Sequence, residues 1–283
     1  MENITLEQAV SLILEHAVVI GDTEELPLLE LSGRVLAADM LAPMDNPPFD
    51  RSPVDGYACR AEDLKSATKE QPVRLDVLEE VDAGQYSHKT VCQGQAVRIM
   101  TGAAIPAGCD CCIRQESTDY GETVVQVYAG VPAWTNYCYK GEDFKKGTLL
   151  IKKGTRLSYT EAGIIASMGY AKAPVYRSPR VALLTTGDEV TPPGQPLLEG
   201  KIYNSNQTML AVRMRELGIQ PFIIDSIEDD PEKMAAALRE ASDKADIIIT
   251  TGGVSVGKKD IMHEALPRTG AERVFWRILL KPG

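Results

Sequence analysis

Strands and helices alternate along the last third of the chain, and this order limits the possible folds more than any other feature of the sequence. After residue 180 the strand-like runs VALLTT, FIIDSI and DIIITT are separated by the helical patterns NQTMLAVRMRELG and DPEKMAAALREASDKA, and a short helix near DIMHEALPR precedes a last strand, VFWRILL. This order predicts a parallel sheet with right-handed crossovers. We therefore expect residues 179–283 to form a doubly wound α/β domain. The chain stops directly after a strand, where such a sheet should continue, so we expect this domain to be incomplete.

Helix signals also stand near the start and the middle of the chain. Thr5 is placed to cap a helix, with Gln8 three positions later and an apolar face beyond it. A second helix, TEAGIIASMG, should begin after Ser158 or Thr160 and stop at Gly169. These helices flank a long region of a different character.

That region consists of short alternating strands separated by turn residues, from about residue 55 to 140. It predicts a small β-rich domain, either a sandwich or a barrel. Four prolines in the preceding stretch APMDNPPFDRSP forbid a helix or a central strand and mark a boundary. We therefore expect an elongated domain formed by residues 1–43 and 142–178, with a β-rich domain at 44–141 inserted into it.

Composition argues against several classes of function. The chain has 283 residues, of which 44% are hydrophobic and 25% charged, enough for two or three domains with buried cores. A formal net charge of −10 argues against broad binding to nucleic acid or to anionic membranes. The N-terminus lacks the pattern of a secretion signal, and no apolar run approaches the roughly 20 residues that span a bilayer. We expect a cytoplasmic protein with no nucleic-acid or membrane partner.

All six cysteines fall between Cys59 and Cys138, and Cys109 and Cys112 have the C-x-x-C spacing of many metal sites. A zinc site would need a second pair or nearby histidines, whereas the three histidines are scattered. Small, semi-apolar residues in a strand of a reduced protein explain the thiols more simply. The role of the Cys109–Cys112 cluster stays open at this point.

Acidic residues follow three strands of the expected α/β domain. Glu189 comes after VALLTT, Asp229 and Asp230 come after FIIDSI, and Asp260 ends the loop after DIIITT. Ligands of open α/β sheets bind outside the carboxyl ends of the strands, and converging carboxylates repel unless a cation such as Mg²⁺ neutralises them. A single acid after a strand is more often a helix N-cap, and either Asp229 or Asp230 could be no more than that. The three strand ends together favour a metal site.

The loop after DIIITT reads TTGGVSVGKKD and is rich in glycine. Gly252 and Gly253 would expose backbone N–H groups near the start of a helix, which is an anion site. The spacing is not that of a P-loop, because Lys258 is not followed by Ser or Thr, and the G-x-G-x-x-G pattern is also missing. By themselves the glycines are a weak signal and could merely bend the chain. Beside a metal site, they suggest a phosphorylated substrate.

A second polar cluster lies in FDRSPVDGYA and VRIMTGAAIPAG, far from the first in sequence. Asp50, Arg51 and Asp55 lie in and just after a proline-rigid loop, and Thr101 closes a strand. The simplest interpretation is two tight turns whose polar side chains cap their own backbone.

Eight motifs, in order and with matching spacing, give the chain a resemblance to a known family. They are PPFDRSPVDGYA, VRIMTGAAIPAG, GEDFKKG, TTGDEV, IYNSN, IEDDPEKM, TTGGVSVGKKD and FWRILLKPG. Together they resemble the MoeA family of molybdopterin molybdotransferases, which includes the E domain of gephyrin. The resemblance spans essentially the whole chain.

The resemblance implies the last step of molybdenum cofactor synthesis. In that step adenylylated molybdopterin is bound, molybdate is inserted at its dithiolene, and AMP is released in a Mg²⁺-dependent cleavage. Motif by motif, the implied catalytic residues are Asp55, Thr101, Asp143, Glu189, Asp229 and Asp260. Glu189, Asp229 and Asp260 among them would hold the metal. The implied substrate-binding residues are Gly252, Gly253, Ser255, Lys258, Arg277 and Lys281.

The resemblance also implies an architecture and partners. Similar proteins are elongated homodimers whose active site forms between the α/β domain of one subunit and the β-rich domain of the other. We expect such a homodimer, joined through the N-terminal helix and the segment after residue 142, with a multidomain α/β plus β fold and an α/β domain like that of MogA-type adenylyltransferases. Those adenylyltransferases and the recipient molybdoenzymes are expected partners. Family members normally continue past KPG into the rest of the α/β domain and a C-terminal β domain, which we expect to be absent here.

Two alternatives stay open. One is a MogA-type adenylyltransferase, against which the long N-terminal region with FDRSPVDGYA argues. The other is a non-catalytic dimeric scaffold, against which the retained acidic motifs argue.

Overall fold

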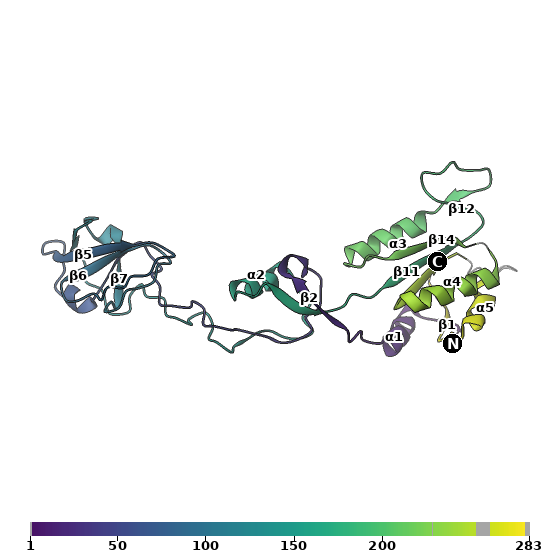
Figure 1. Cartoon of the computed structure of the whole chain (residues 1–283), viewed down its shortest axis with the longest axis horizontal. Coiled ribbons are helices and arrows are strands. Elements are labelled where there is room, and N and C mark those ends of the chain that lie inside the picture. Colours follow the sequence, from purple (N-terminus) through teal and green to yellow (C-terminus); the bar gives the residue numbers. More distant parts are fainter. Residues whose placement is uncertain (1, 228, 253–260, 281–283) are drawn as a thin grey trace. The chain divides into compact units, whose positions relative to one another are not determined.

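Two compact units make up the chain. The computed structural model describes residues 2–227, 229–252 and 261–280. The first unit, here the α/β unit, comprises Met1–Ala38, Lys153–Gly163 and Ala171–Gly283, and the second, the β-rich unit, comprises Asp39–Lys152 and Ile164–Tyr170. Figure 1 labels the elements along the chain. The three-part division expected from the sequence stays a prediction.

A parallel sheet forms the centre of the α/β unit. Within the described residues its strand order is β14 (Phe222–Ile227), β11 (Val181–Thr186) and β15 (Ile247–Thr251). The central strand β11 runs parallel to both neighbours, and Leu183, for example, is the partner of Ile249. All three strands therefore end at the same edge, as the alternating pattern predicts.

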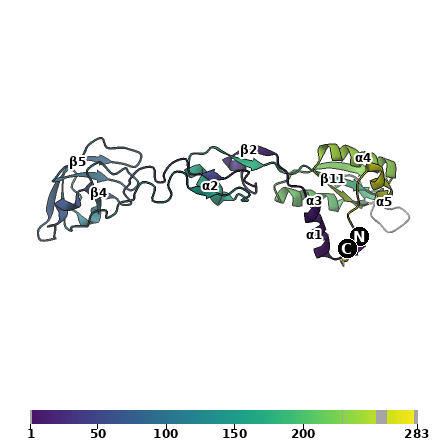
Figure 2. The ribbon, with the colours of Figure 1, turned by 90° about the horizontal axis from the view of Figure 1, so that it is seen from below.

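Helices cover both faces of this sheet, as Figure 2 shows. Ala182 and Leu184 of β11 belong to one core, which they share with Met234 and other side chains of α4 and α5. Val181 and Leu183 belong to a second core on the other face, with α3. The helices are α3 (Ser205–Glu216), α4 (Pro231–Lys244) and α5 (Ile261–Ala265). With both faces covered, every residue of β11 is buried, which is typical of a parallel strand.

Two further helices begin at the caps that the sequence predicts. For α1 (Leu6–His16), the Thr5 hydroxyl accepts the Gln8 N–H at 3.3 Å, and the Gln8 side chain accepts the Thr5 N–H at 2.9 Å. For α2 (Tyr159–Ser167), the Ser158 hydroxyl accepts the Thr160 N–H at 3.2 Å, so the cap is Ser158 rather than Thr160. Each side chain satisfies an N–H that the helix start leaves without a partner.

Smaller strand pairs complete the α/β unit. They are β1 (Glu2–Ile4) with β16 (Trp276–Ile278), β2 (Thr23–Pro27) with β10 (Lys172–Tyr176), and β12 (Val190–Thr191) with β13 (Ile202–Tyr203). The strand expected over VFWRILL is thus present as β16, but it pairs in parallel with β1 and not with the three-stranded sheet. The sequence pattern could not predict this pairing, because it joins opposite ends of the chain.

A mixed five-stranded sheet forms the β-rich unit. Its order in the described structure is β7-β4-β6-β5-β8, in which β5 and β6 run parallel and the other neighbours antiparallel. The strands are β4 (Gly56–Cys59), β5 (Val73–Val81), β6 (Gln95–Ile99), β7 (Cys111–Arg114) and β8 (Val124–Val127). The short pair β3 (Met40–Leu41) and β9 (Leu149–Ile151) lies at the base of the unit's sequence. The prediction of short strands without a long helix is confirmed for residues 55–140.

The cysteines fill both cores of this sheet. Cys59 and Cys111 face each other across β4 and β7, with their sulfur atoms 3.8 Å apart, in one core. Cys109 and Cys112 belong to the other core, where burial raises the pKa of the Cys112 thiol to about 12. All six thiols are free. The thiols of these four residues therefore act as small apolar packing groups.

No helix within the described ranges combines the length and the apolar composition needed to cross a membrane.

Candidate functional site

The end of β11 turns sharply at the carboxyl edge of the parallel sheet. Gly187 has φ +130°, and a Cβ at this position would lie 2.7 Å from both Glu189 Oε2 and Val190 Cγ2. Glycine is therefore required for the turn that places Glu189. The Glu189 carbonyl accepts the Ile202 N–H at 2.8 Å, which ties the turn to β13. No described residue hydrogen-bonds or forms an ion pair with the exposed Glu189 carboxylate.

Asp229 and Asp230, which the sequence could not separate, have different roles. Asp230 caps α4: its Oδ1 accepts the N–H groups of Glu232 and Lys233 at 2.8 and 3.0 Å, and the bond from Lys233 lowers its pKa most. Asp229 does not cap the helix. Its Oδ1 accepts the Thr186 hydroxyl at 3.3 Å, across the ends of β14 and β11. The capping role thus belongs to Asp230, and Asp229 keeps most of its acceptor capacity.

The end of β15 approaches β11 closely. Gly252 has φ +86°, and a Cβ there would lie 2.2 Å from the Thr186 carbonyl oxygen. Just before it, the hydroxyls of Thr251 and Thr185 lie 3.4 Å apart. Thr186, which the sequence analysis did not single out, therefore touches both Asp229 and the position of Gly252. Its place after an apolar strand and before Gly-Asp-Glu was the available signal.

Several predicted residues fall outside the described structure. They are Gly253, Ser255, Lys258, Asp260 and Lys281. Of the proposed metal ligands, Glu189 and Asp229 are described and Asp260 is not. Within the described ranges, no group of three or more His, Cys, Asp or Glu side chains is arranged to hold a metal ion. The three-carboxylate site therefore stays a prediction.

Arg277 lies in β16 rather than in the parallel sheet. Its side chain is exposed, and its φ of +67° is uncommon for a residue with a Cβ. Its substrate-binding role stays a prediction.

The opposite, amino edge of the same sheet is held by ion pairs. Asp246, directly before β15, contacts Arg177 Nη1 at 2.7 Å and Arg180 Nη2 at 3.1 Å, and it also accepts the Arg180 backbone N–H at 2.7 Å. The bond from Arg177 contributes most to holding the pKa of Asp246 far below its usual range. This edge is locked by the chain's own charges.

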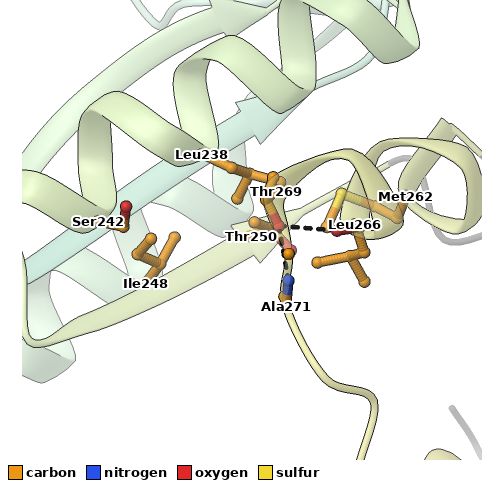
Figure 3. A pocket seen from close by; sticks show the side chains of 9 residues that line it. Leu238, Ser242, Ile248, Thr250, Met262, Leu266, Thr269 and Ala271 are labelled. Carbon is orange, nitrogen blue, oxygen red and sulfur yellow. Dashed lines mark hydrogen bonds between the residues drawn. The ribbon is translucent and has the colours of Figure 1, made fainter.

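A hollow of about 500 Å³ lies beside β15, between α4, α5 and the 3-10 helix Leu266–Thr269. Figure 3 shows its apolar walls, which include Leu238, Ile248 and Met262, and the bonds of the Thr269 hydroxyl to the Leu266 carbonyl and the Ala271 N–H. Its lining contains none of the predicted acids. An apolar wall of this kind is unsuited to a phosphate group.

Asp55 and Thr101 meet in the β-rich unit. Asp55 Oδ1 accepts both the Thr101 N–H and the Thr101 hydroxyl, each at 2.7 Å. These bonds, the hydroxyl first, lower the pKa of Asp55. The interpretation that polar residues cap their own turns is correct for Ser52, which bonds the Val54 backbone, but wrong for Asp55, which joins two loops. Loop closure between distant segments outcompeted the local turn.

Arg51 joins the same loops to the GED motif. Its backbone exchanges hydrogen bonds of 2.9 and 3.0 Å with Cys138 and also bridges to Ala104. Its guanidinium lies 4.0 Å from an Asp143 carboxylate oxygen, and both side chains are about half exposed. Asp143 and Arg51 are therefore neighbours at the surface, as are Asp55 and Thr101.

Three aromatic rings between these loops were missed by the sequence analysis. Trp134, Tyr137 and Tyr139, here the aromatic triad, have ring centroids 4.9 to 5.7 Å apart. The Tyr137 hydroxyl donates to Asp50 Oδ2 at 2.8 Å, while the Lys140 N–H donates to Asp50 Oδ1 at 2.7 Å. The stretch WTNYCYKGED, with three aromatics in six residues before the GED motif, was the available signal.

Comparison with known families agrees with this geometry. Residues 4–169 match the family described as the MoeA N-terminal region (domain I and II), and residues 182–283 match the family described as a probable molybdopterin binding domain. The second match defines the class of the α/β domain. The first covers more than half of the chain, and the chain belongs to the MoeA family.

Individual relatives agree over most of the chain. It is 40% identical over 267 residues to the molybdopterin molybdenumtransferase of Bacillus subtilis, and 35% identical over 280 residues to that of Staphylococcus epidermidis. These matches cover 93% and 99% of this chain but 62% and 67% of the relatives. The crystal structure of the MoeA protein of Pyrococcus horikoshii is similar with a TM-score of 0.79 at 34% identity, covering 94% of this chain and 66% of that one. The chain thus spans about two thirds of the length of these relatives.

Proposed function

We propose that this protein inserts molybdenum into adenylylated molybdopterin with release of AMP, the last step of molybdenum cofactor biosynthesis. The relatives named above are molybdopterin molybdenumtransferases, and both of their matched regions are present here. The observation that carries the proposal is the position of Asp229: it stands at the carboxyl edge of the sheet, bonded to Thr186, while its neighbour Asp230 performs the capping. An acid released from a structural role at this edge is available to a ligand.

The chemistry of the donor set fits Mg²⁺. This ion is usually held by one or two carboxylates together with substrate phosphates and water, not by a complete cage of protein ligands. Glu189 and Asp229 supply two carboxylates at one edge, and Asp260 would be the third. Mg²⁺ bound there would neutralise phosphate charge and polarise the phosphoanhydride. The substrates would be molybdate and adenylylated molybdopterin.

The acids of the β-rich unit would serve the same reaction in another way. Because Thr101 lowers the pKa of Asp55, this carboxylate stays ionised at neutral pH and cannot donate a proton. We assign it, with Thr101, to accepting hydrogen bonds from the substrate and orienting it. Asp143 beside Arg51 would form a second polar contact, and Ser255, Lys258, Arg277 and Lys281 would bind phosphate or oxyanion groups.

We further propose a homodimer in which the site is shared between subunits. The support is the apolar surface of α1 and of the segment after it, where Leu14 is 69% and Val18 90% exposed. Exposed apolar groups of this extent mark interfaces. Leu14→Glu should convert dimer to monomer in sedimentation, whereas Glu15→Gln should not; a monomeric wild-type chain at micromolar concentration would contradict the proposal.

The alternatives are less well supported. The match over residues 4–169 argues against an adenylyltransferase consisting of the α/β domain alone. We place the activity in the cytoplasm, where the six free thiols stay reduced, and we propose a MogA-type adenylyltransferase and the recipient molybdoenzymes as transient partners.

The test is AMP release from adenylylated molybdopterin, with and without molybdate and Mg²⁺. Asp229→Asn should lower the rate on the order of 100-fold or more, since it removes a charge that the cation requires. Asp230→Asn is the matched control: asparagine caps a helix as well as aspartate, so its rate should stay near wild type. Equal activity of both variants would remove Asp229 from the site, and absence of AMP release by the wild-type protein would overturn the function.

A further inference from the structure

The aromatic triad has a surface that the contacts described so far do not use. Trp134 is 54% exposed and Tyr139 43% exposed, although each ring touches the other two. Trp134 and Tyr137 meet edge to face at 88°, while Tyr139 is tilted by 39° from Trp134. The triad therefore keeps large faces of two rings in solvent.

The backbone holds these rings in place. Trp134 and Asn136 have φ of +69° and +50°, in the left-handed region that residues with a Cβ rarely adopt. The Asn136 side chain donates to the Cys112 carbonyl at 2.9 Å, and the Thr135 carbonyl accepts the Cys112 N–H at 3.0 Å. The loop is thus anchored to β7 from both sides. Strained residues that the surroundings hold in this way cluster at ligand sites.

The triad is also surrounded by the polar groups of the candidate site. Tyr137 is bonded to Asp50, and the adjacent Arg51 lies beside Asp143. The Tyr139 N–H donates to the Glu142 carboxylate at 2.9 Å. An apolar platform with charged groups at its rim suits a planar ring that carries N–H and carbonyl groups at its edge.

We propose that the aromatic triad is a stacking platform for a fused heteroaromatic ring of the substrate. This inference rests on the proposed function, whose substrate carries two such rings, the adenine and the pterin. A stable protein interface buries about 800 Å² per partner, whereas the exposed parts of Trp134 and Tyr139 amount to only on the order of 200 Å². The size of the platform therefore favours a ring over a protein.

The protein supplies its own reporter. Trp134 and Trp276 are its two tryptophans, so Trp276→Phe leaves Trp134 as the source of tryptophan emission. In this background AMP, a soluble pterin and ribose 5-phosphate are titrated separately. We expect saturable quenching by AMP or by the pterin, which identifies the ring that stacks, and none by ribose 5-phosphate. If neither ring compound quenches the emission, the proposal is overturned.

A second variant tests the platform itself. Tyr139→Ala should weaken the quenching ligand at least tenfold, whereas Tyr86→Ala, an exposed tyrosine of the same unit with one ring neighbour, His88, should not. Unchanged binding by Tyr139→Ala would overturn the platform, as would an emission change that depends on protein concentration alone and so points to a protein partner. If ring binding follows these expectations while the wild-type protein releases no AMP, the platform stands and the proposed function fails.

Discussion

The acidic residues of the β-rich loops and those at the carboxyl edge of the parallel sheet are used in opposite ways. Asp55 and Asp50 each accept two hydrogen bonds of 2.7 to 2.8 Å from the chain itself. At the carboxyl edge, Asp229 accepts one longer bond, and no described residue engages the Glu189 carboxylate. The difference shows that the β-rich acids fix loops in place, whereas the edge acids retain acceptor capacity for a ligand.

The edge itself depends on backbone and not on charge, which Gly252→Ala should expose most strongly. The left-handed backbone costs alanine about 1 kcal/mol, and the contact with the Thr186 carbonyl adds about 1–3 kcal/mol, so we expect a loss near 3 kcal/mol in urea unfolding. Gly218→Ala is the control, because it has φ +79° but no atom within 4 Å of the added Cβ, and should lose about 1 kcal/mol. Equal losses would mean that close approach plays no part.

The amino edge should be the next most sensitive, because its carboxylate is fully engaged. Asp246→Asn removes the charge that Arg177 and Arg180 share and should lower the unfolding midpoint at pH 7, followed by Trp276 emission. The folded pKa of Asp246 lies below its unfolded value near 4. Its stabilisation is therefore complete above about pH 4 and is lost as the pH falls through the folded pKa, so wild type and variant should converge in acid.

Asp243→Asn, at an exposed position near the end of α4, is the matched control for this experiment. Its midpoint should follow wild type at every pH. A difference between wild type and Asp246→Asn that persists undiminished in acid would show that the ion pairs do not stabilise the edge.

The smallest effect on stability is expected at Asp55. Asp55→Asn keeps one acceptor oxygen but weakens the bonds from Thr101, so the Trp134-detected midpoint should fall by less than for Asp246→Asn. The sign of the pH dependence is the same: the pKa of Asp55 is lowered by folding, so the difference should be full at pH 7 and shrink below about pH 4. Asp143→Asn, whose partner Arg51 lies 4.0 Å away at the surface, should show no change. A larger shift for Asp143→Asn than for Asp55→Asn would reverse the assignment of roles.

The sequence predicted the elements whose signals are local. The Thr5–Gln8 capping box, the start of α2 and the three parallel strands all follow from patterns within a few residues of one another. The edge that carries Glu189 and Asp229 followed from strand order alone, since parallel strands must end together.

Contacts between distant segments could not be predicted in this way. Asp55 bonds to Thr101 and Asp50 to Tyr137 because the fold brings separate loops together. The choice between Asp229 and Asp230 depended on where α4 begins, to a precision of one residue, which propensity does not provide. The pairing of β1 with β16 involves the two ends of the described chain and has no local signal.

The distribution of cysteines has a consequence for following local opening. All six lie in the β-rich unit, where Cys92 is exposed and Cys138 half-buried, while the other four are enclosed in the two cores of the five-stranded sheet. A thiol reagent should therefore modify the first two in the native protein and reach the remaining four only when the sheet opens. The rate of that slow phase measures the opening equilibrium of one unit while the α/β unit, which has no cysteine, contributes nothing to the signal.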